Sequence, residues 1–263
     1  MWDTRRSWLV AGSPMTVVTQ DSGLGDDIAR AFNEFEMTAR RSRGRWTFQI
    51  TKTKDRWKLY HDSCQVGSYP RVDDVVPHLV AIMNRTALED AARFAIHSGA
   101  IAMGLRTVAI PAESGHGKTT LTAALVKAGF DYLSDEALVF DDDGSVVPYP
   151  KPFALSEWSA RKLGVPIRGE ETLATASDLG GKVGEGGRLT DLILSEYGHE
   201  YLTLEPLPKS QAVAALIQYS FNHYKDPARA FRIATDVARD LSVWRLEYDD
   251  PIEAAEVISN TLR

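Results

Sequence analysis

A phosphate-binding loop is the clearest chemical signal in the chain. Residues 112–119, AESGHGKT, fit the Walker A pattern with alanine at the leading glycine position. An apolar strand at 107–110 precedes the loop and a helix is expected from Lys118, which is the context that this motif requires. Backbone N–H groups at a helix N-terminus form a concave anion site, and the glycines let phosphate approach closely. The alternative is a chance match at an ordinary strand-to-helix turn.

The loop predicts a nucleoside triphosphate as ligand. Lys118 would neutralise the β and γ phosphates, and the Thr119 hydroxyl would ligate Mg²⁺. His116 lies inside the loop, where its backbone matters more than its ring. The expected nucleotide-binding residues are Glu113, Ser114, Gly115, His116, Gly117, Lys118, Thr119 and Thr120.

An acidic pair follows the loop. Asp135 and Glu136 begin seventeen residues after Lys118, at the carboxyl end of a short strand expected at 130–133. Strands beside a P-loop bring such residues to the edge where the phosphates bind. One carboxylate can hold Mg²⁺ while another accepts the proton of an attacking hydroxyl. In a simple ATPase, Asp135 would instead be a Walker B acid and Glu136 a solvated turn residue.

Further candidates are one histidine and several cations. His97 lies on the strand expected before the P-loop strand, where it can hydrogen-bond to a carboxylate and orient it; alone, a strand histidine is more often structural. Lys151 and Arg188 are candidate second cations for the phosphates. Their alternatives are a solvated lysine between prolines and an arginine at a loop exit. Lys182 lies in the glycine-rich run 180–187.

The patterns that position these residues predict an α/β protein with two domains, at 1–92 and 93–263. The first reads as a small α+β unit: a helix from the pair Asp26 and Asp27 to about Arg41, a hairpin, and a bridging helix. The second holds the strand, loop and helix around Lys118, followed by a hairpin and C-terminal helices. Its long loop at 165–187 is expected to be mobile and to close over nucleotide and acceptor, carrying Lys182 and Arg188.

Composition and charge exclude several classes of protein. The 263 residues are 44% hydrophobic and 25% charged, which excludes disordered, collagen-like and disulfide-scaffold proteins. The net charge of -6 argues against a general nucleic-acid binder. An arginine cluster at Arg40, Arg41, Arg43 and Arg45 could still meet an acidic partner, or be a helix C-terminus. One cysteine, Cys64, and the lack of a signal-like or membrane-spanning apolar stretch lead us to expect a cytoplasmic protein.

A family resemblance rests on four segments: IHSGAIA (96–102), ESGHGKTTL (113–121), GFDYLSDEALVF (129–140) and PYPKPFALS (148–156). In this order and spacing, they resemble the catalytic domain of HPr kinase/phosphorylase and its relatives, the kinases of peptide-tailoring clusters such as those for lasso peptides. The resemblance covers about residues 93–250. It implies an HPr-kinase-like P-loop core with a small N-terminal α+β unit and C-terminal helices.

The resemblance also implies roles. Asp135 would be the proton acceptor, Glu136 would be associated with the metal, and His97 would match the family histidine. Arg188, after Gly187, would match the family's glycine-arginine phosphate loop. Two departures stand out: Glu136 replaces an aspartate, and PYPKPFALSEW replaces the family's signature segment after the hairpin.

The expected reaction is transfer of the γ-phosphoryl group of ATP, with Mg²⁺, to a Ser or Thr hydroxyl of a peptide or protein. Asp135, His97, Lys118 and Arg188 would be the catalytic residues, and Thr119 and Glu136 the metal ligands. One alternative is a kinase for a small-molecule (natural-product) hydroxyl, and another is a nucleotide-binding regulatory module without an acceptor. We expect neither nucleic acid nor a membrane as partner. A homo-oligomer is a further expectation, because this family tends to form rings.

Overall fold

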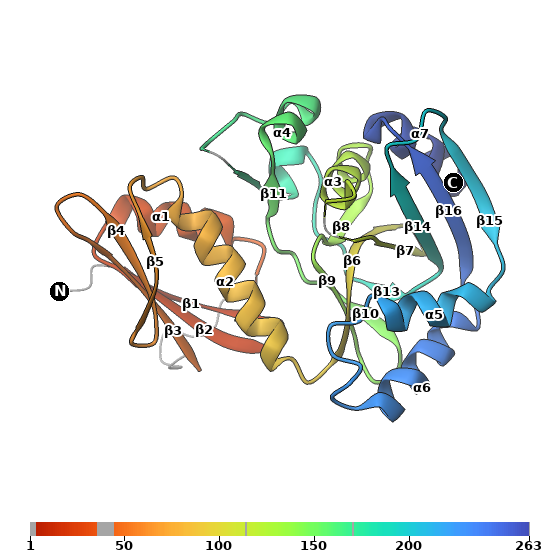
Figure 1. Cartoon of the computed structure of the whole chain (residues 1–263), viewed down its shortest axis with the longest axis horizontal. Helices are drawn as coiled ribbons and strands as arrows, with labels where there is room; N and C mark the ends of the chain where they lie inside the picture. The colour runs from red at the N-terminus through yellow and green to blue at the C-terminus, as the bar shows by residue number, and fades with distance from the viewer. Residues whose placement is uncertain (1–3, 36–44, 114, 170, 263) are drawn as a thin grey trace. The chain divides into compact units, whose positions relative to one another are not determined.

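The chain divides into two compact units, shown together in Figure 1. The computed structural model describes residues 4–35, 45–113, 115–169 and 171–262. One unit comprises Met1–Ala91 with Ala154–Thr175, and the other comprises Ala92–Phe153 with Ala176–Arg263. The segment 154–175 thus belongs with the N-terminal residues, whereas the sequence placed all of 93–263 in one domain. No helix within the described residues combines the length and apolar content that crossing a bilayer requires.

The first unit contains the following elements: β1 (Thr4–Val10), β2 (Ser13–Thr19), α1 (Ser22–Ala31), β3 (Trp46–Lys52), β4 (Trp57–His61), β5 (Cys64–Tyr69), α2 (Val75–Asp90), most of β11 (Phe153–Leu155), α4 (Glu157–Leu163) and β12 (Thr172–Ala174). Strands β1 to β5 form one sheet in chain order, antiparallel except for the parallel pair β2 and β3. Alternating apolar residues bury one face, where Phe48 and Leu59 are fully enclosed. Helices α1 and α2 pack against this sheet.

Helix α1 is shorter than its apolar periodicity predicts. It begins after Asp21, whose carboxylate accepts a hydrogen bond from the Leu24 N–H at 2.8 Å. It ends at Ala31, and the Phe32 ring lies 5.0 Å from that of Trp8. The expected end near Arg41 is therefore wrong. In the arginine cluster, Arg40, Arg41 and Arg43 lie outside the described residues, and the Arg45 guanidinium lies over the Trp46 ring.

The second unit contains these elements: β6 (Phe94–Met103), β7 (Arg106–Pro111), α3 (Lys118–Lys127), β8 (Asp131–Ser134), β9 (Ala137–Phe140), β10 (Ser145–Val147), a 3₁₀ turn (Ser177–Leu179), β13 (Gly187–Arg188), β14 (Asp191–Tyr197), β15 (Thr203–Leu207), α5 (Ser210–Gln218), α6 (Pro227–Ala238), β16 (Ser242–Tyr248) and α7 (Pro251–Leu262). The sheet order is β13-β10-β9-β6-β7-β14-β16-β15, and β8 also pairs with β6. Strands β7, β14 and β16 run parallel. The unit is mixed α/β, as expected.

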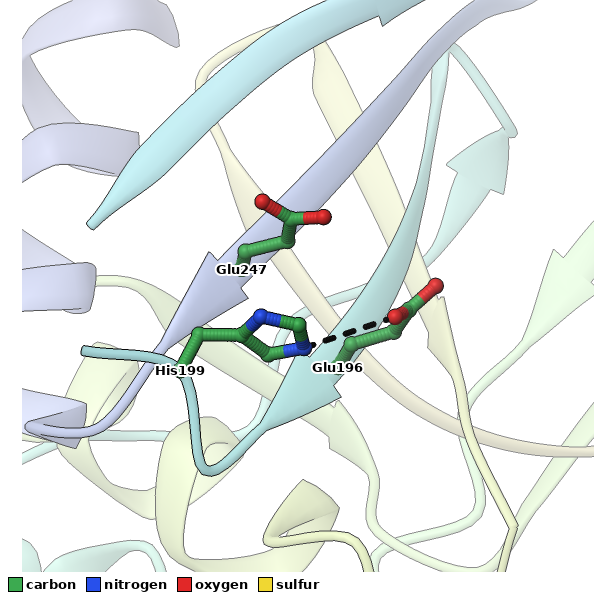
Figure 2. Close-up of side chains that lie close together, drawn as sticks. All are labelled: Glu196, His199 and Glu247. Atoms are coloured by element: carbon green, nitrogen blue, oxygen red, sulfur yellow. Dashed lines mark ion pairs between the residues drawn. The ribbon is translucent and has the colours of Figure 1, made fainter. Parts of the chain in front are cut away.

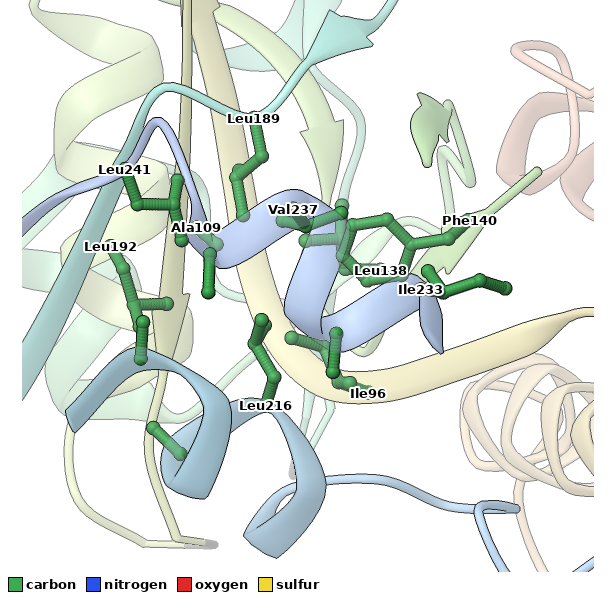
Figure 3. Close-up of a cluster of buried hydrophobic side chains, with 14 of the residues drawn as sticks. Ile96, Ala109, Leu138, Phe140, Leu189, Leu192, Leu216, Ile233, Val237 and Leu241 are labelled. Carbon is green, nitrogen blue, oxygen red and sulfur yellow. The ribbon is translucent and has the colours of Figure 1, made fainter. Parts of the chain in front are cut away.

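Helices cover this sheet and bury its apolar side chains. Figure 3 shows Ile96, Leu192 and neighbouring sheet residues packed against Leu216 of α5 and Val237 of α6. Helices α3 and α7 pack against each other, and α3 also packs on β6. The core thus holds the strand that carries His97 and fixes the place of the helix that begins at Lys118.

The glycine-rich segment 180–187 lies packed against the sheet, which corrects the expectation of a mobile lid. The Tyr132 N–H donates to the Lys182 carbonyl at 2.8 Å, and the Gly184 N–H donates to the Tyr132 carbonyl at 2.9 Å. At Gly186, which has a φ of +84°, an added Cβ would lie 2.2 Å from the Val146 carbonyl oxygen. These glycines permit close backbone approach rather than freedom of movement.

A buried carboxylate ties the start of β14 to its neighbours. Asp191 is fully buried and accepts hydrogen bonds from the Arg106 guanidinium at 3.0 and 3.1 Å, from the Trp244 indole at 3.1 Å and from the Thr190 hydroxyl at 2.8 Å. Removing it would leave these donors without their acceptor.

We expect Asp191→Ala to lower the free energy of unfolding by about 2 kcal/mol, because the Trp244 indole and the Thr190 hydroxyl lose a buried acceptor, whereas the half-exposed Arg106 guanidinium can be hydrated. Urea denaturation of the full chain measures this. Asp240→Ala, which removes an exposed aspartate, is the matched control. A loss at Asp191 no larger than that of the control would contradict the expected role.

Candidate active site

The P-loop connects β7 to α3. Strand β7 ends at Pro111, and Gly117 caps the N-terminus of α3 with a φ of +76°. Gly115 also has a positive φ, of +87°, a conformation that costs glycine little. A Cβ on Gly117 would lie 2.7 Å from the Tyr248 hydroxyl, so space and backbone both require glycine there. The loop therefore leaves the N–H groups at the start of α3 available to an anion.

A second glycine brings α3 close to the sheet. At Gly99 on β6, an added Cβ would lie 2.2 Å from the Thr122 hydroxyl oxygen and 3.5 Å from Cγ of Lys118. The small residue thus allows the first turns of α3 to rest on β6. As a result, Lys118 reaches the side chains at the middle of that strand, and it is 5% exposed.

His97 joins the loop lysine to the acidic pair. Strands β6 and β9 are antiparallel with His97 opposite Ala137, which places the histidine beside the turn that carries Glu136. Its Nε2 lies 2.5 Å from Lys118 Nζ and 3.7 Å from Glu136 Oε1. Burial, and next the Lys118 charge, lower the pKa of His97. A neutral ring that accepts a hydrogen bond from the Lys118 ammonium at Nε2 fits this environment.

The turn between β8 and β9 presents the acidic pair. Ser134 fixes it: its hydroxyl donates to the Ala137 carbonyl at 2.7 Å and accepts from the N–H groups of Glu136 and Ala137, at 3.3 and 3.1 Å. The Ser98 N–H also donates to the Glu136 carbonyl, at 3.2 Å. Sequence reasoning missed Ser134, although a serine preceding an acidic pair at a strand end is a common turn signal.

Asp135 is the most enclosed group of the site. It is 2% exposed, and burial raises its pKa to about 6 against the opposing charges of Lys151 and Lys118. The Thr119 side chain hydrogen-bonds to the carboxyl, which favours the ionised form. Its Oδ1 is buried and has no hydrogen-bond partner among the described residues. A buried carboxylate oxygen without a partner is costly, so a ligand that binds there would gain free energy.

Lys151 completes the cluster. Its Nζ lies 3.6 Å from Glu136 Oε2 and 4.0 Å from Asp135 Oδ2, and the residue is 6% exposed. The alternative of a solvated lysine between prolines is therefore wrong. Lys118 and Lys151 face the two carboxylates from different elements. The site thus holds two buried cations, an acidic pair and a histidine at the mouth of an anion-binding loop.

The oxygen donors of the site suit Mg²⁺. Thr119, Asp135 and Glu136 offer one hydroxyl and two carboxylates, which are the hard ligands that Mg²⁺ prefers. Asp135 Oδ1, which has no partner within the described part of the chain, agrees with a cation or a hydroxyl bound at this point. Thr119 and Glu136 were the metal ligands expected from the sequence; Thr119 hydrogen-bonds to Asp135, and the charge of Glu136 acts on it.

Two expected residues lie elsewhere. Arg188 on β13 is exposed and pairs with Ser145 of β10. Its neighbour Gly187 lies near Thr107, at the start of β7, whereas the P-loop follows the other end of that strand. The placement of Arg188 at the phosphates is therefore wrong. Lys182 is also exposed, and its Nζ lies 3.5 Å from Asp131 Oδ2 at the start of β8.

The remaining loop residues divide by exposure. Glu113, Gly115 and His116 are exposed, and Thr120 is buried within the first turn of α3. Ser114 lies outside the described residues. His97 contacts Lys118 and Glu136 rather than Asp135, so the expected orientation of Asp135 by His97 is replaced by the hydrogen bond from Thr119.

The raised pKa of Asp135 has a consequence for stability. A carboxyl whose pKa is higher in the folded state binds its proton more tightly there, so its ionisation opposes folding above pH 6 and not below about pH 4. We expect the free energy of unfolding of Asp135→Asn, relative to that of the parent, to rise as the pH increases from about 4 to about 8, because only the parent must ionise a buried carboxyl. Urea denaturation of both proteins at several pH values measures it. A relative stability that falls over this range would show that ionised Asp135 contributes to folding.

Comparison with known proteins adds little. No protein-family model matches the chain, and no curated protein matches it. Among solved structures, the HPr(Ser) kinase/phosphatase from Coxiella burnetii matches with a TM-score of 0.33 and 11% sequence identity, covering 64% of this chain and 95% of that chain. A TM-score this low gives no ground for assigning an activity, which must be argued from the site.

Proposed function

We propose that this chain is an ATP-dependent kinase that transfers the γ-phosphoryl group to a Ser or Thr hydroxyl of a peptide or protein, in the manner of the peptide-tailoring kinases. One observation carries the proposal: the buried carboxylate of Asp135 adjoins the lysine and threonine of a P-loop, and its Oδ1 has no hydrogen-bond partner among the residues that the structure describes. A simple ATPase can also hold a buried acid that serves Mg²⁺, so the test of the proposal is whether Asp135 accepts the proton of an acceptor hydroxyl.

In phosphoryl transfer, some residues of the site stabilise the charge of the phosphates and Asp135 accepts the proton of the acceptor. The N–H groups at the start of α3 bind the phosphate oxygens, and Lys118 leaves His97 to contact the transferring group. Bound Mg²⁺, held by Thr119 and Glu136, would neutralise charge on the β and γ phosphates. Asp135 accepts the proton of the acceptor hydroxyl. At the same time the hydroxyl oxygen bonds to the γ-phosphorus, and the bond from that phosphorus to the bridging oxygen of the leaving ADP breaks. Lys151 keeps Asp135 ionised enough to act as the base.

His97 has a different task from the one the sequence indicated. Its Nε2 accepts a hydrogen bond from Lys118 and lies 3.7 Å from Glu136 Oε1. It therefore holds the lysine in place beside the loop and spaces it from the acidic pair. When phosphate attracts Lys118, the released imidazole can pair with Glu136.

Three reactions that differ only in the acceptor distinguish this function from its alternatives. The full chain is incubated with Mg²⁺ and γ-³²P-labelled ATP, together with a degenerate peptide library centred on Ser or Thr, with a set of small-molecule alcohols, or with no acceptor. Label on the library supports the peptide kinase. Label confined to small alcohols identifies the small-molecule kinase, and nucleotide binding without label in any reaction identifies a regulatory module. Asp135→Asn serves as the inactive control for each reaction.

A further inference from the structure

A second cluster of metal-ligating side chains lies apart from Asp135 and Lys118. Glu196, His199 and Glu247 each offer a ligand atom, and these atoms all lie within 4.8 Å of one another. His199 Nε2 is 3.5 Å from Glu196 Oε2, the pair joined by the dashed line in Figure 2. The three residues come from the ends of β14 and β16 and from the turn that follows β14 (Figure 2). The proposed kinase function uses none of them.

The fold brings the three side chains close together. Strands β14 and β16 are parallel, with Glu196 directly opposite Glu247, so both carboxylates leave the same face of the sheet. The turn after β14 is tied to β16 because the N–H groups of Gly198 and His199 donate to the Tyr248 carbonyl, at 2.8 and 3.2 Å. Gly198, with a φ of +95°, reverses the chain so that the imidazole returns over the two carboxylates.

Charge and hydrogen bonding leave the cluster able to accept a cation. The Thr203 hydroxyl donates to Glu247 Oε2 at 3.2 Å, which orients the carboxylate. Arg245 is a nearby cation, but its guanidinium is shared: it lies 3.9 Å from Glu247 Oε1 and 3.4 Å from Glu205 Oε2. The carboxylates of Glu196, Glu205 and Glu247 outnumber this arginine, which leaves an excess of negative charge here.

We propose that Glu196, His199 and Glu247 bind a divalent transition-metal cation of the Zn²⁺ class. One imidazole and two carboxylates are a ligand set that suits Zn²⁺, with water at the open position. Ligand atoms around tetrahedral Zn²⁺ lie about 3.3 Å apart, close to the separation of His199 from Glu196. Mg²⁺ prefers oxygen ligands alone, so the imidazole distinguishes this site from the one at Thr119.

The position of the cluster indicates what the metal would stabilise. The residues that follow the two glutamates, Tyr197 and Tyr248, lie against the position of Gly117 in the P-loop. A metal that joins the ends of β14 and β16 to their turn therefore fastens the strands on which the loop rests. Its role is structural, and the proposal is independent of the kinase reaction.

Calorimetric titration of the chelator-treated, nucleotide-free full chain with Zn²⁺ tests the site. His199→Asn and Glu247→Gln should each weaken Zn²⁺ binding by at least about tenfold. Glu200→Gln, the loss of an adjacent exposed carboxylate, should bind as the parent does. Co²⁺ in the same titration should give a visible absorption spectrum that His199→Asn abolishes. Circular dichroism without metal establishes that the variants are folded.

A parallel titration of His97→Asn separates this site from metal bound at the acidic pair. Zn²⁺ binding that survives in His97→Asn and is lost in His199→Asn supports the proposed site. Binding that is lost in His97→Asn and unchanged in His199→Asn and Glu247→Gln would overturn it. Equal weakening in Glu200→Gln would overturn it as well, because binding would then follow net charge rather than these ligands.

Discussion

Lys118→Ala should lose phosphoryl transfer by at least about 10²–10³-fold and bind Mg·ATP more weakly than the parent. The reason is electrostatic: Lys118 is 5% exposed, and in so enclosed a site no water can replace its charge on the transferring phosphate. Its removal also leaves the acidic pair with one buried cation, Lys151. Isothermal titration with Mg·ATP and the rate of γ-phosphoryl transfer measure the two effects.

The matched control is Lys127→Ala, at the other end of the same helix. Lys127 is exposed in the last turn of α3, so its loss removes the same charge without entering the site. The control should transfer phosphoryl at a rate close to that of the parent. Transfer by Lys118→Ala at the rate of Lys127→Ala would mean that residues 112–119 do not hold the reacting phosphates.

Asp135→Asn should lower turnover by about 10²–10⁴-fold while it keeps most of the affinity for Mg·ATP. The amide preserves the shape of the carboxyl but cannot accept the hydroxyl proton, and general-base catalysis is typically worth that factor. Stopped assays of transfer and titration with Mg·ATP measure the two quantities separately. Asp131→Asn, at the start of the preceding strand β8, where the carboxylate pairs with exposed Lys182, should retain turnover.

Glu136→Gln distinguishes the two acidic residues. If Glu136 holds the metal, its variant should recover part of its activity as the Mg²⁺ concentration rises, whereas Asp135→Asn should not. The reverse pattern, with ATP affinity lost in Asp135→Asn and recovery on added Mg²⁺, would exchange the two roles.

The P-loop and the acidic pair are predictable from sequence because their chemistry is local. Eight consecutive residues specify the loop, and Asp135 and Glu136 follow a short strand directly. His97 required one further condition, that its strand pairs with its neighbours near the P-loop and the acidic pair, and β6 does pair with β7, β8 and β9. The partner of His97 was not predictable, because Gly99 decides how closely α3 approaches β6.

Errors arose where one sequence signal has two physical meanings. Glycine-rich segments can be mobile loops or backbones packed too closely for a side chain, and 180–187 is the second kind. Arg188 was misplaced along with that segment. For Lys151, a candidate second cation, the sequence left open a solvated lysine between prolines, and the tertiary fold decides against that alternative by burying Lys151 beside Glu136. Whether a charged side chain is buried beside an ion-pair partner depends on elements that are distant in the sequence, and local sequence patterns do not encode this.

The central claim is that Asp135 serves transfer to a hydroxyl, and a single-turnover experiment tests it most directly. Enzyme in excess over γ-³²P-labelled ATP is mixed with Mg²⁺ and an acceptor peptide selected from the library, and the reaction is stopped in acid at successive times. In the parent, loss of ATP should equal formation of phosphopeptide. In Asp135→Asn, bound ATP should remain intact over the same period. Phosphopeptide formed by Asp135→Asn at the parent rate, or parent turnover that yields only inorganic phosphate, would contradict the claim.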